Sequence, residues 1–215
     1  MSNREREQNN IVAALFVLER GPYFGIKNVE PWDINRDARK YSGPHPFVAH
    51  PPCERWGRYW SGGPSVKVKR KLGDDKGCFE SALNSVRKYG GVLEHPEASH
   101  AFKKFRLGKP PSEGGWVLSD DFMGWICCVE QGWYGHRARK ATWLYAVDIE
   151  LPSLKWGRAP GDFVRLDAGF HSIEERRRAI RTGACQRLSK RQRALTPDLF
   201  RDLLLKMART KGASP

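Results

Sequence analysis

A cysteine follows two prolines and a short apolar run in Phe47-Val48-Ala49-His50-Pro51-Pro52-Cys53. The apolar run predicts a buried strand, and the prolines restrict the backbone after it, so the Cys53 thiol is presented at the strand's carboxyl end. Open α/β sheets bind ligands beyond that edge. We expect His50, Arg55 and Arg58 to favour the thiolate, which is the nucleophilic form. The pattern predicts a nucleophile at Cys53, with a small buried side chain as the alternative.

A second short apolar run ends in a carboxylic acid at Leu93-Glu94-His95-Pro96. If the two predicted strands are neighbours in one sheet, Glu94 lies beside Cys53. A carboxyl group with a raised pKa in such a place can donate a proton or hydrogen-bond to the edge of a base. We therefore take Glu94 as the candidate acid, and a solvated or helix-capping glutamate is the alternative.

A third candidate is the basic stretch Tyr134-Gly135-His136-Arg137-Ala138-Arg139-Lys140, which Trp133 and Trp143 flank. Cations beside aromatic rings are typical of loops that bind phosphates and stack on bases. The stretch predicts nucleic-acid contacts by Arg137, Arg139 and Lys140, and a solvated run of charge is the alternative. Arg55 and Arg58, beside Cys53, are further candidates for nucleic-acid contacts.

The overall charge points to the same class of partner. The 215 residues include 38 Lys and Arg against 24 Asp and Glu, which gives a net charge of +14. Twelve of these cations lie between Arg176 and Lys211, together with only two acids. An excess that is both large and clustered favours a polyanion, above all nucleic acid, over a charged surface that only maintains solubility.

Cysteine usage and hydropathy indicate a cytoplasmic protein. The five cysteines have no CxxC spacing, so neither a disulfide framework nor a zinc site is expected, and the thiols are expected to be reduced. Residues 1–10 are polar and lack the apolar core of a signal peptide. No apolar run approaches the roughly 20 residues of a membrane helix, and we expect no membrane association.

Strand and helix signals alternate in the first half of the chain, which predicts an α/β fold: a reduced Rossmann-like sheet with helices on both faces. We expect this unit to span residues 1–150, and residues 151–215 to form a basic helical segment packed on it. The predicted strands are 11–17, 26–29, 47–50, 91–94, 125–130 and 142–149. The predicted helices are 33–41, 74–90, 99–105, 173–181 and one that starts at Thr196-Pro197, with Leu199, Phe200, Leu203, Leu204 and Met207 directed inward.

Together, these blocks resemble the cytosine-5 DNA methyltransferases, and most closely a compact phage-type set of such proteins. Pro51-Pro52-Cys53 matches the family's nucleophile loop, and Glu94 stands where the family has the acid of its Glu-Asn-Val motif. The stretch from Tyr134 to Arg139 is similar to a variant of its Gln/Arg-rich motif. Val29-Glu30-Pro31-Trp32-Asp33 is similar to the acidic strand end that holds the cofactor's ribose.

The resemblance implies a DNA pyrimidine-modifying transferase. Cys53 would attack C6 of the base, Glu94 would protonate the ring, and Arg137 and Arg139 would orient base or phosphate. The implied cofactor is S-adenosylmethionine, and its candidate binding residues are Gly21, Glu30 and Asp33. Chemistry on a base requires its extrusion from the duplex, and we expect the aromatic loop 56–60 to hold the extruded base.

The first cofactor motif is shortened, which leaves two alternatives. Only residues 18–24 separate the first predicted strand from the next apolar run, whereas a parallel crossover needs about a dozen residues or more. We therefore expect no strand-helix-strand cofactor unit. The alternatives are a DNA-binding relative without catalysis, and a pyrimidine C5-modifying enzyme that uses another donor.

Overall fold

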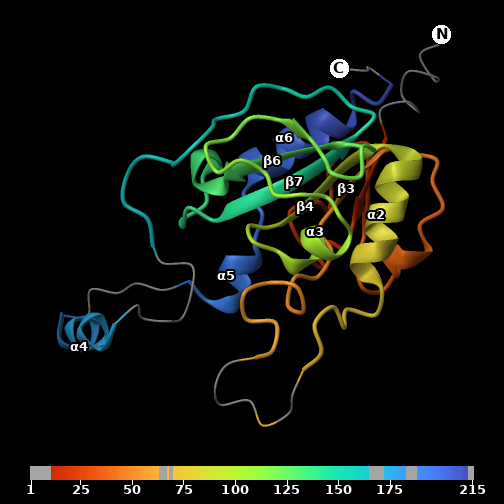
Figure 1. Cartoon of the computed structure of the whole chain (residues 1–215). Coiled ribbons are helices and arrows are strands. Elements are labelled where there is room, and N and C mark those ends of the chain that lie inside the picture. The colour runs from red at the N-terminus through yellow and green to blue at the C-terminus, as the bar shows by residue number, and fades with distance from the viewer. Residues whose placement is uncertain (1–10, 63–66, 68–69, 165–171, 183–187, 213–215) are drawn as a thin grey trace.

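The computed structural model describes residues 11–62, 67, 70–164, 172–182 and 188–212, so the polar residues 1–10 and Cys185 lie outside the described part. These segments form a seven-stranded sheet in the order β2-β1-β3-β4-β7-β6-β5 with helices on both faces (Figure 1). The predicted α/β, Rossmann-like fold class is confirmed.

The sheet has a parallel half and an antiparallel half. Strands β1 to β4 run parallel to one another, β7 is antiparallel to both β4 and β6, and β5 is antiparallel to β6. The strands are β1 (Val12–Leu15), β2 (Val29–Trp32), β3 (Phe47–Ala49), β4 (Gly91–Pro96), β5 (Val117–Leu118), β6 (Trp125–Glu130) and β7 (Ala141–Val147).

The order of the parallel strands reverses between β1 and β3. Strand β2 lies on one side of β1, and the chain then returns to the other side to form β3 and β4. In open α/β sheets, the crevice beyond the carboxyl ends at such a reversal is the usual ligand site. The carboxyl end of β3 leads directly into His50 and the Pro-Pro-Cys loop.

The predicted second strand, 26–29, is wrong: β2 occupies Val29–Trp32. The connection from β1 is therefore residues 16–28, which is long enough for the parallel pairing that the structure shows. As expected, no helix occupies this connection. It is built from turns, in which the Gly21 amide donates to the Leu18 carbonyl over 2.9 Å and Phe24 donates to Gly21 over 3.1 Å.

One face of the sheet is covered by α2 (Cys78–Tyr89) and the short helix α3 (His100–Lys104) (Figure 1). The helical periodicity of the sequence predicts the buried face of α2 correctly, because Phe79, Ala82, Leu83 and Val86 are all fully buried. Trp56 and Phe102 pack in the same core, together with Leu93 from β4.

The helix predicted over 33–41 is reduced to one 3-10 turn, η1 (Ala38–Lys40). Asp33 caps a local turn instead, accepting from the amides of Asn35 and Arg36 over 3.0 and 3.3 Å.

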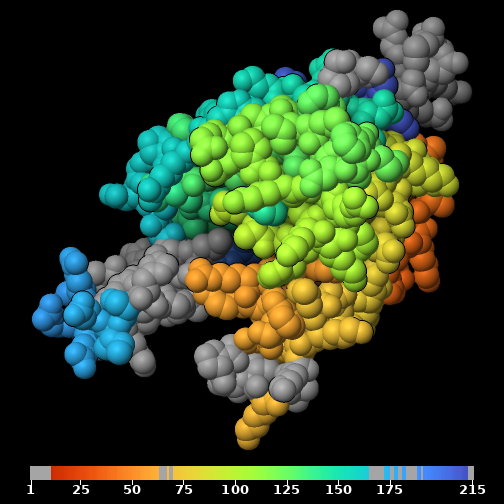
Figure 2. All heavy atoms as spheres, viewed as in Figure 1, coloured from red at the N-terminus to blue at the C-terminus, as the bar shows by residue number. Residues whose placement is uncertain are grey.

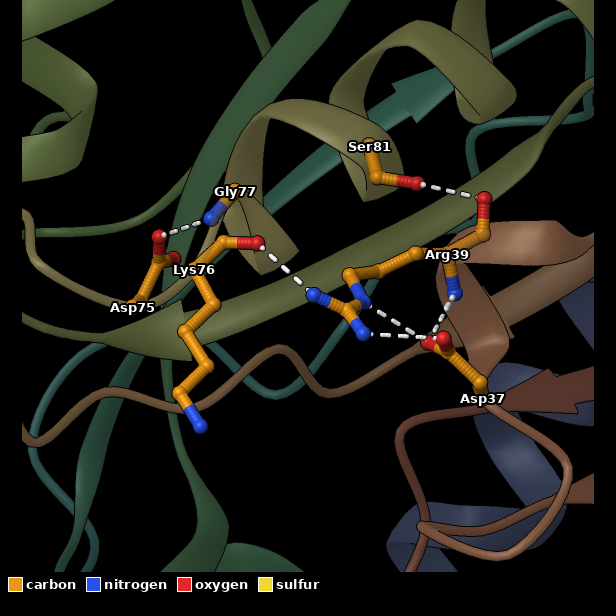
Figure 3. A network of polar contacts seen from close by, with 6 residues as sticks. All are labelled: Asp37, Arg39, Asp75, Lys76, Gly77 and Ser81. Carbon is orange, nitrogen blue, oxygen red and sulfur yellow. Dashed lines mark hydrogen bonds and ion pairs between the residues drawn. The ribbon is translucent and has the colours of Figure 1, made fainter.

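A polar network ties η1 to the start of α2 (Figure 3). Arg39 pairs with the Asp37 carboxylate at 2.7 Å and donates to the Lys76 carbonyl over 3.2 Å. The Ser81 hydroxyl donates back to the Arg39 carbonyl over 3.4 Å. The Lys76 side chain itself extends away from this network.

The opposite face of the sheet is covered by α6 (Asp198–Ala208). Phe200, Leu204 and Met207 are buried there, as predicted, against Val48 and Val92 among others. The prediction for Leu199 is wrong. This side chain is 66% exposed, whereas Leu205, which was not predicted to face inward, is buried.

Two further helices precede α6, namely α4 (Ile173–Thr182) and α5 (Lys190–Ala194). The helix predicted over 173–181 is confirmed, whereas α5 was not predicted. Figures 1 and 2 show α4 standing away from the sheet. Among the helices that the structure describes, none is long and apolar enough to cross a membrane.

The packing of α6 predicts a stability difference between two leucines of one helix. Leu204→Ala removes a fully buried side chain and is expected to lower the free energy of unfolding by about 2–5 kcal/mol. Leu199→Ala, at the exposed position, is expected to change it by less than about 0.5 kcal/mol. Urea denaturation followed by circular dichroism measures both. Equal effects would contradict the packing of α6 on the sheet.

Candidate active site

The site forms where β3 and β4 end. His50 follows β3, and its backbone amide donates to the Leu15 carbonyl of β1 over 3.0 Å, which fixes its position at the sheet edge. Its Nδ1 lies 2.8 Å from Oε2 of Glu94, on the neighbouring strand β4. The structure thus brings together the ends of the two strands that the sequence singled out.

The His50–Glu94 pair is the centre of a longer chain of hydrogen bonds. Tyr23, from the connection after β1, places its hydroxyl 2.7 Å from His50 Nε2. On the other side, Gln131 Nε2 donates to Glu94 Oε1 over 3.2 Å and to the Thr142 hydroxyl over 3.0 Å. This series of hydrogen bonds therefore joins the connection after β1 to the ends of β3, β4 and β6 and to the start of β7.

Sequence reasoning missed Tyr23, Gln131 and Thr142. Gln131 directly follows the buried strand β6, and a polar residue just after a buried strand is the same signal that identified Cys53 and Glu94. Tyr23 gave no such signal, because it lies in a turn whose path no periodicity predicts.

Glu94 is an ionised carboxylate, which corrects the expectation of a raised pKa. Burial raises the pKa of Glu94, but the hydrogen bond from His50 and the charges of His50 and Lys140 outweigh it and lower the pKa to about 2. At neutral pH, Glu94 therefore accepts hydrogen bonds and is not the resident proton donor.

Cys53 is a thiol, which corrects the expectation of a stabilised thiolate. The residue has an exposed surface, yet protein atoms crowd the sulfur, and this desolvation raises the pKa of the Cys53 thiol, as does the charge of Glu94. Lys140 acts in the opposite direction. In return, the charges of Glu94 and Cys53 raise the pKa of Lys140, although burial lowers it overall. The three groups thus form one electrostatic cluster.

His95 supports the loop that carries Cys53. It is fully buried, and its Nδ1 lies 2.6 Å from the Ser99 hydroxyl. The Ser99 oxygen also accepts from the Ala101 amide. Among the described residues, His95 Nε2 has no hydrogen bond of good geometry, but the carbonyls of Pro52 and Pro51 raise the pKa of His95. Burial dominates and lowers it to about 4.

The aromatic loop after Cys53 is partly buried in the core. Trp56 is 1% exposed, and its Nε1 donates to Asp75 over 2.8 Å. The expectation that Trp56 holds an extruded base is therefore wrong. Tyr59 is exposed, and the Arg58 guanidinium carbon lies 5.7 Å from the centroid of its ring. Arg55 has a buried guanidinium nitrogen with no hydrogen-bond partner among the described residues.

The basic stretch after η2 (Gln131–Tyr134) is largely bound to the protein itself. Arg139 donates to the carbonyls of Ala159 and Gly161 and lies 3.7 Å from Glu130. Lys140 donates to the Leu195 carbonyl over 2.9 Å. Arg137 has an exposed surface. Lys140 therefore acts on Cys53 and Glu94 through its charge, while Arg139 anchors the segment around residue 160.

The residues expected to hold S-adenosylmethionine are engaged in protein contacts. Both Asp33 oxygens accept hydrogen bonds within their own turn, and Glu30 lies within β2 rather than at its end.

The crevice at the strand reversal is also occupied. A Cβ at Gly21 would meet the Leu18 carbonyl at 2.8 Å, and Tyr23, 2% exposed, lies against His50. These residues do not fit the cofactor.

Comparisons of the chain with protein-family models, with curated proteins and with solved structures found no match. Within the part of the chain that the structure describes, no group of three or more His, Cys, Asp or Glu could hold a metal ion. The geometry of the site is therefore the basis for the function proposed below.

His95 and Glu94, both buried on β4, predict that the free energy of unfolding falls over two ranges of pH. The pKa of His95 falls from 6.5 to about 4 on folding, so its contribution is present above pH 6.5 and is lost as the pH falls through 4. The pKa of Glu94 falls from 4.5 to about 2, so its contribution is lost between those values.

Denaturation at a series of pH values tests both windows. His95→Gln is expected to flatten the pH dependence between 6.5 and 4, and Glu94→Gln is expected to flatten it between 4.5 and 2. His100→Gln, at an exposed histidine, is the matched control and should follow the unmodified protein. A profile unchanged by His95→Gln would contradict the burial of a neutral imidazole.

Proposed function

We propose that this protein acts on a pyrimidine base of DNA through covalent attack by Cys53. The observation that carries the proposal is the arrangement at the carboxyl ends of the neighbouring strands β3 and β4, where Glu94 is held by His50 over 2.8 Å and acts electrostatically on the Cys53 thiol and on Lys140. A thiol, a carboxylate and a cation at that edge are the groups needed to activate a pyrimidine. The net charge of +14 supports a nucleic-acid substrate.

The step proposed is addition of the thiol across the C5–C6 double bond of the base. The sulfur forms a bond to C6, the double bond is lost, and C5 takes up a proton, so no other reactant is needed. The reverse step expels the sulfur and removes a hydrogen from C5. Because a thiol proton exchanges with water, repeated addition and elimination replaces the C5 hydrogen with one from solvent.

Each neighbour of Cys53 has a role in this step. Lys140 stabilises the sulfur as it loses its proton, which offsets the desolvation that keeps the resting group a thiol. The ionised Glu94 accepts a hydrogen bond from the exocyclic amino group of cytosine. His50 and Gln131 hold the Glu94 carboxylate in place for this contact.

A second candidate function is a DNA-binding protein without catalysis. Two observations favour it: the pKa of the Cys53 thiol is raised, and Tyr23 fills the crevice where a cofactor is expected. The two candidates differ in what Cys53→Ala changes. A binding protein keeps its function in this variant, whereas an enzyme keeps only its affinity for DNA.

Exchange of the C5 hydrogen tests the proposal directly. DNA carrying tritium at C5 of cytosine or uracil is incubated with the protein, and tritium released into water is counted. We expect release by the unmodified protein, no release by Cys53→Ala, and a reduction of about 100-fold by Glu94→Gln. Cys78→Ser, a half-buried cysteine at the start of α2, is the control and should release tritium normally.

The outcomes separate the candidates. Release that Cys53→Ala does not abolish, or no release at all, refutes the covalent step. Tight DNA binding by both proteins without release then favours the binding function. Addition of labelled S-adenosylmethionine to the assay tests the donor. Transfer of the labelled methyl group to C5 would identify that cofactor, and exchange without methyl transfer would indicate a donor of another class.

A further inference from the structure

A cavity of about 720 Å³ lies between α3 and the segment that follows it. It is distinct from the Cys53 cluster, and its lining comes from residues 98–109, from the turn 120–122 and from Trp143 of β7. Helix α3 and this segment lie on the face turned to the viewer in Figures 1 and 2. Its volume lies within the range of small-molecule sites.

The charge of the lining is strongly positive. Lys103, Arg106 and Lys109 line the cavity with a single carboxylate, Asp120. All three cations are exposed. Within the described residues, their side chains form no ion pair or hydrogen bond, unlike those of Arg139 and Lys140. Cations that the fold does not use can neutralise the phosphates of a ligand.

Aromatic rings lie beside these cations. Trp143, which is 6% exposed, forms part of the wall and packs on Phe102 with ring centroids 5.2 Å apart. Phe122 also lines the cavity, and it is 79% exposed, so most of its ring is open to a ligand. An exposed ring next to lysines and arginines is the arrangement on which nucleic-acid bases stack while their phosphates are neutralised.

The backbone around the cavity is strained. Ala98, Arg106 and Phe122 have φ values of 58°, 56° and 59°, in the left-handed region that side chains other than glycine rarely adopt. All three line this one cavity. Such conformations concentrate at binding and catalytic sites.

The cavity is also connected to the Cys53 loop. Ser99 lines it and is hydrogen-bonded to His95, whose pKa the backbone carbonyls of Pro52 and Pro51 raise. A ligand in the cavity therefore lies one hydrogen-bonded side chain away from the backbone that carries the thiol.

We propose that this cavity binds a nucleotide, with its phosphate on Lys103, Arg106 and Lys109 and its base against Phe122. The nucleotide is either free or part of a single strand, because both present the same base and phosphate. The proposal stands on the cavity alone and does not require the chemistry at Cys53.

Fluorescence anisotropy tests it with the full chain and two probes: a labelled ten-nucleotide deoxythymidine strand, and a labelled deoxythymidine monophosphate. We expect Arg106→Ala to weaken binding and to reduce the slope of log affinity against log salt by about one for each phosphate that the variant no longer neutralises. Phe122→Ala is expected to weaken binding by about 5- to 100-fold with little change in that slope.

Two control variants keep the result specific. Lys76→Ala removes one positive charge from an exposed position just before α2, and Leu199→Ala removes an exposed apolar side chain from α6. Both should bind as the unmodified protein does. Binding of the strand alone identifies a strand site, and binding of both probes identifies a nucleotide site.

The proposal is overturned if neither probe binds, or if the control variants weaken binding as much as the cavity variants. Its failure is distinct from failure of the tritium assay. Cys53→Ala should leave binding of both probes intact, and Phe122→Ala should bind poorly whether or not the protein exchanges hydrogen at C5.

Discussion

A buried carboxylate must have partners, and this constraint organises the end of the sheet. Glu94 is 8% exposed on β4, where an unpaired charge would be costly. His50 and Gln131 satisfy it from opposite sides, and Lys140 adds a nearby positive charge. Because β4 is the strand at which parallel pairing gives way to antiparallel pairing, these partners come from both halves. The charge thus fixes how the two halves meet.

The same constraint decides what the site can do. A carboxylate that is held in its ionised form cannot supply a proton at neutral pH, but it can hold a base by accepting hydrogen bonds. Cys53 shows the complementary behaviour, since desolvation and the charge of Glu94 favour its protonated form and Lys140 opposes them. Under the proposed function, a bound base would change this balance.

Sequence analysis predicted those helices and strands that the local periodicity of apolar residues specifies. The buried face of α2, the strands β3, β4 and β6, and the placement of Cys53 and Glu94 at neighbouring strand ends all follow from apolar periodicity and from where it stops. Chain reversals could not be predicted in this way. The site of β2, the position of Tyr23 and the burial of Trp56 depend on contacts between distant segments, and the pKa directions of Cys53 and Glu94 depend on the same contacts.

The position of α6 has a consequence for synthesis of the protein. This helix, near residue 200, covers the face of β3 and β4, whose residues 47–49 and 91–96 are made much earlier. During translation, Val48 and Val92 therefore emerge from the ribosome without the helix that will shield them. The sheet remains open on one face until residue 208 has left the exit tunnel, and a nascent chain stalled before that point presents an apolar surface to chaperones.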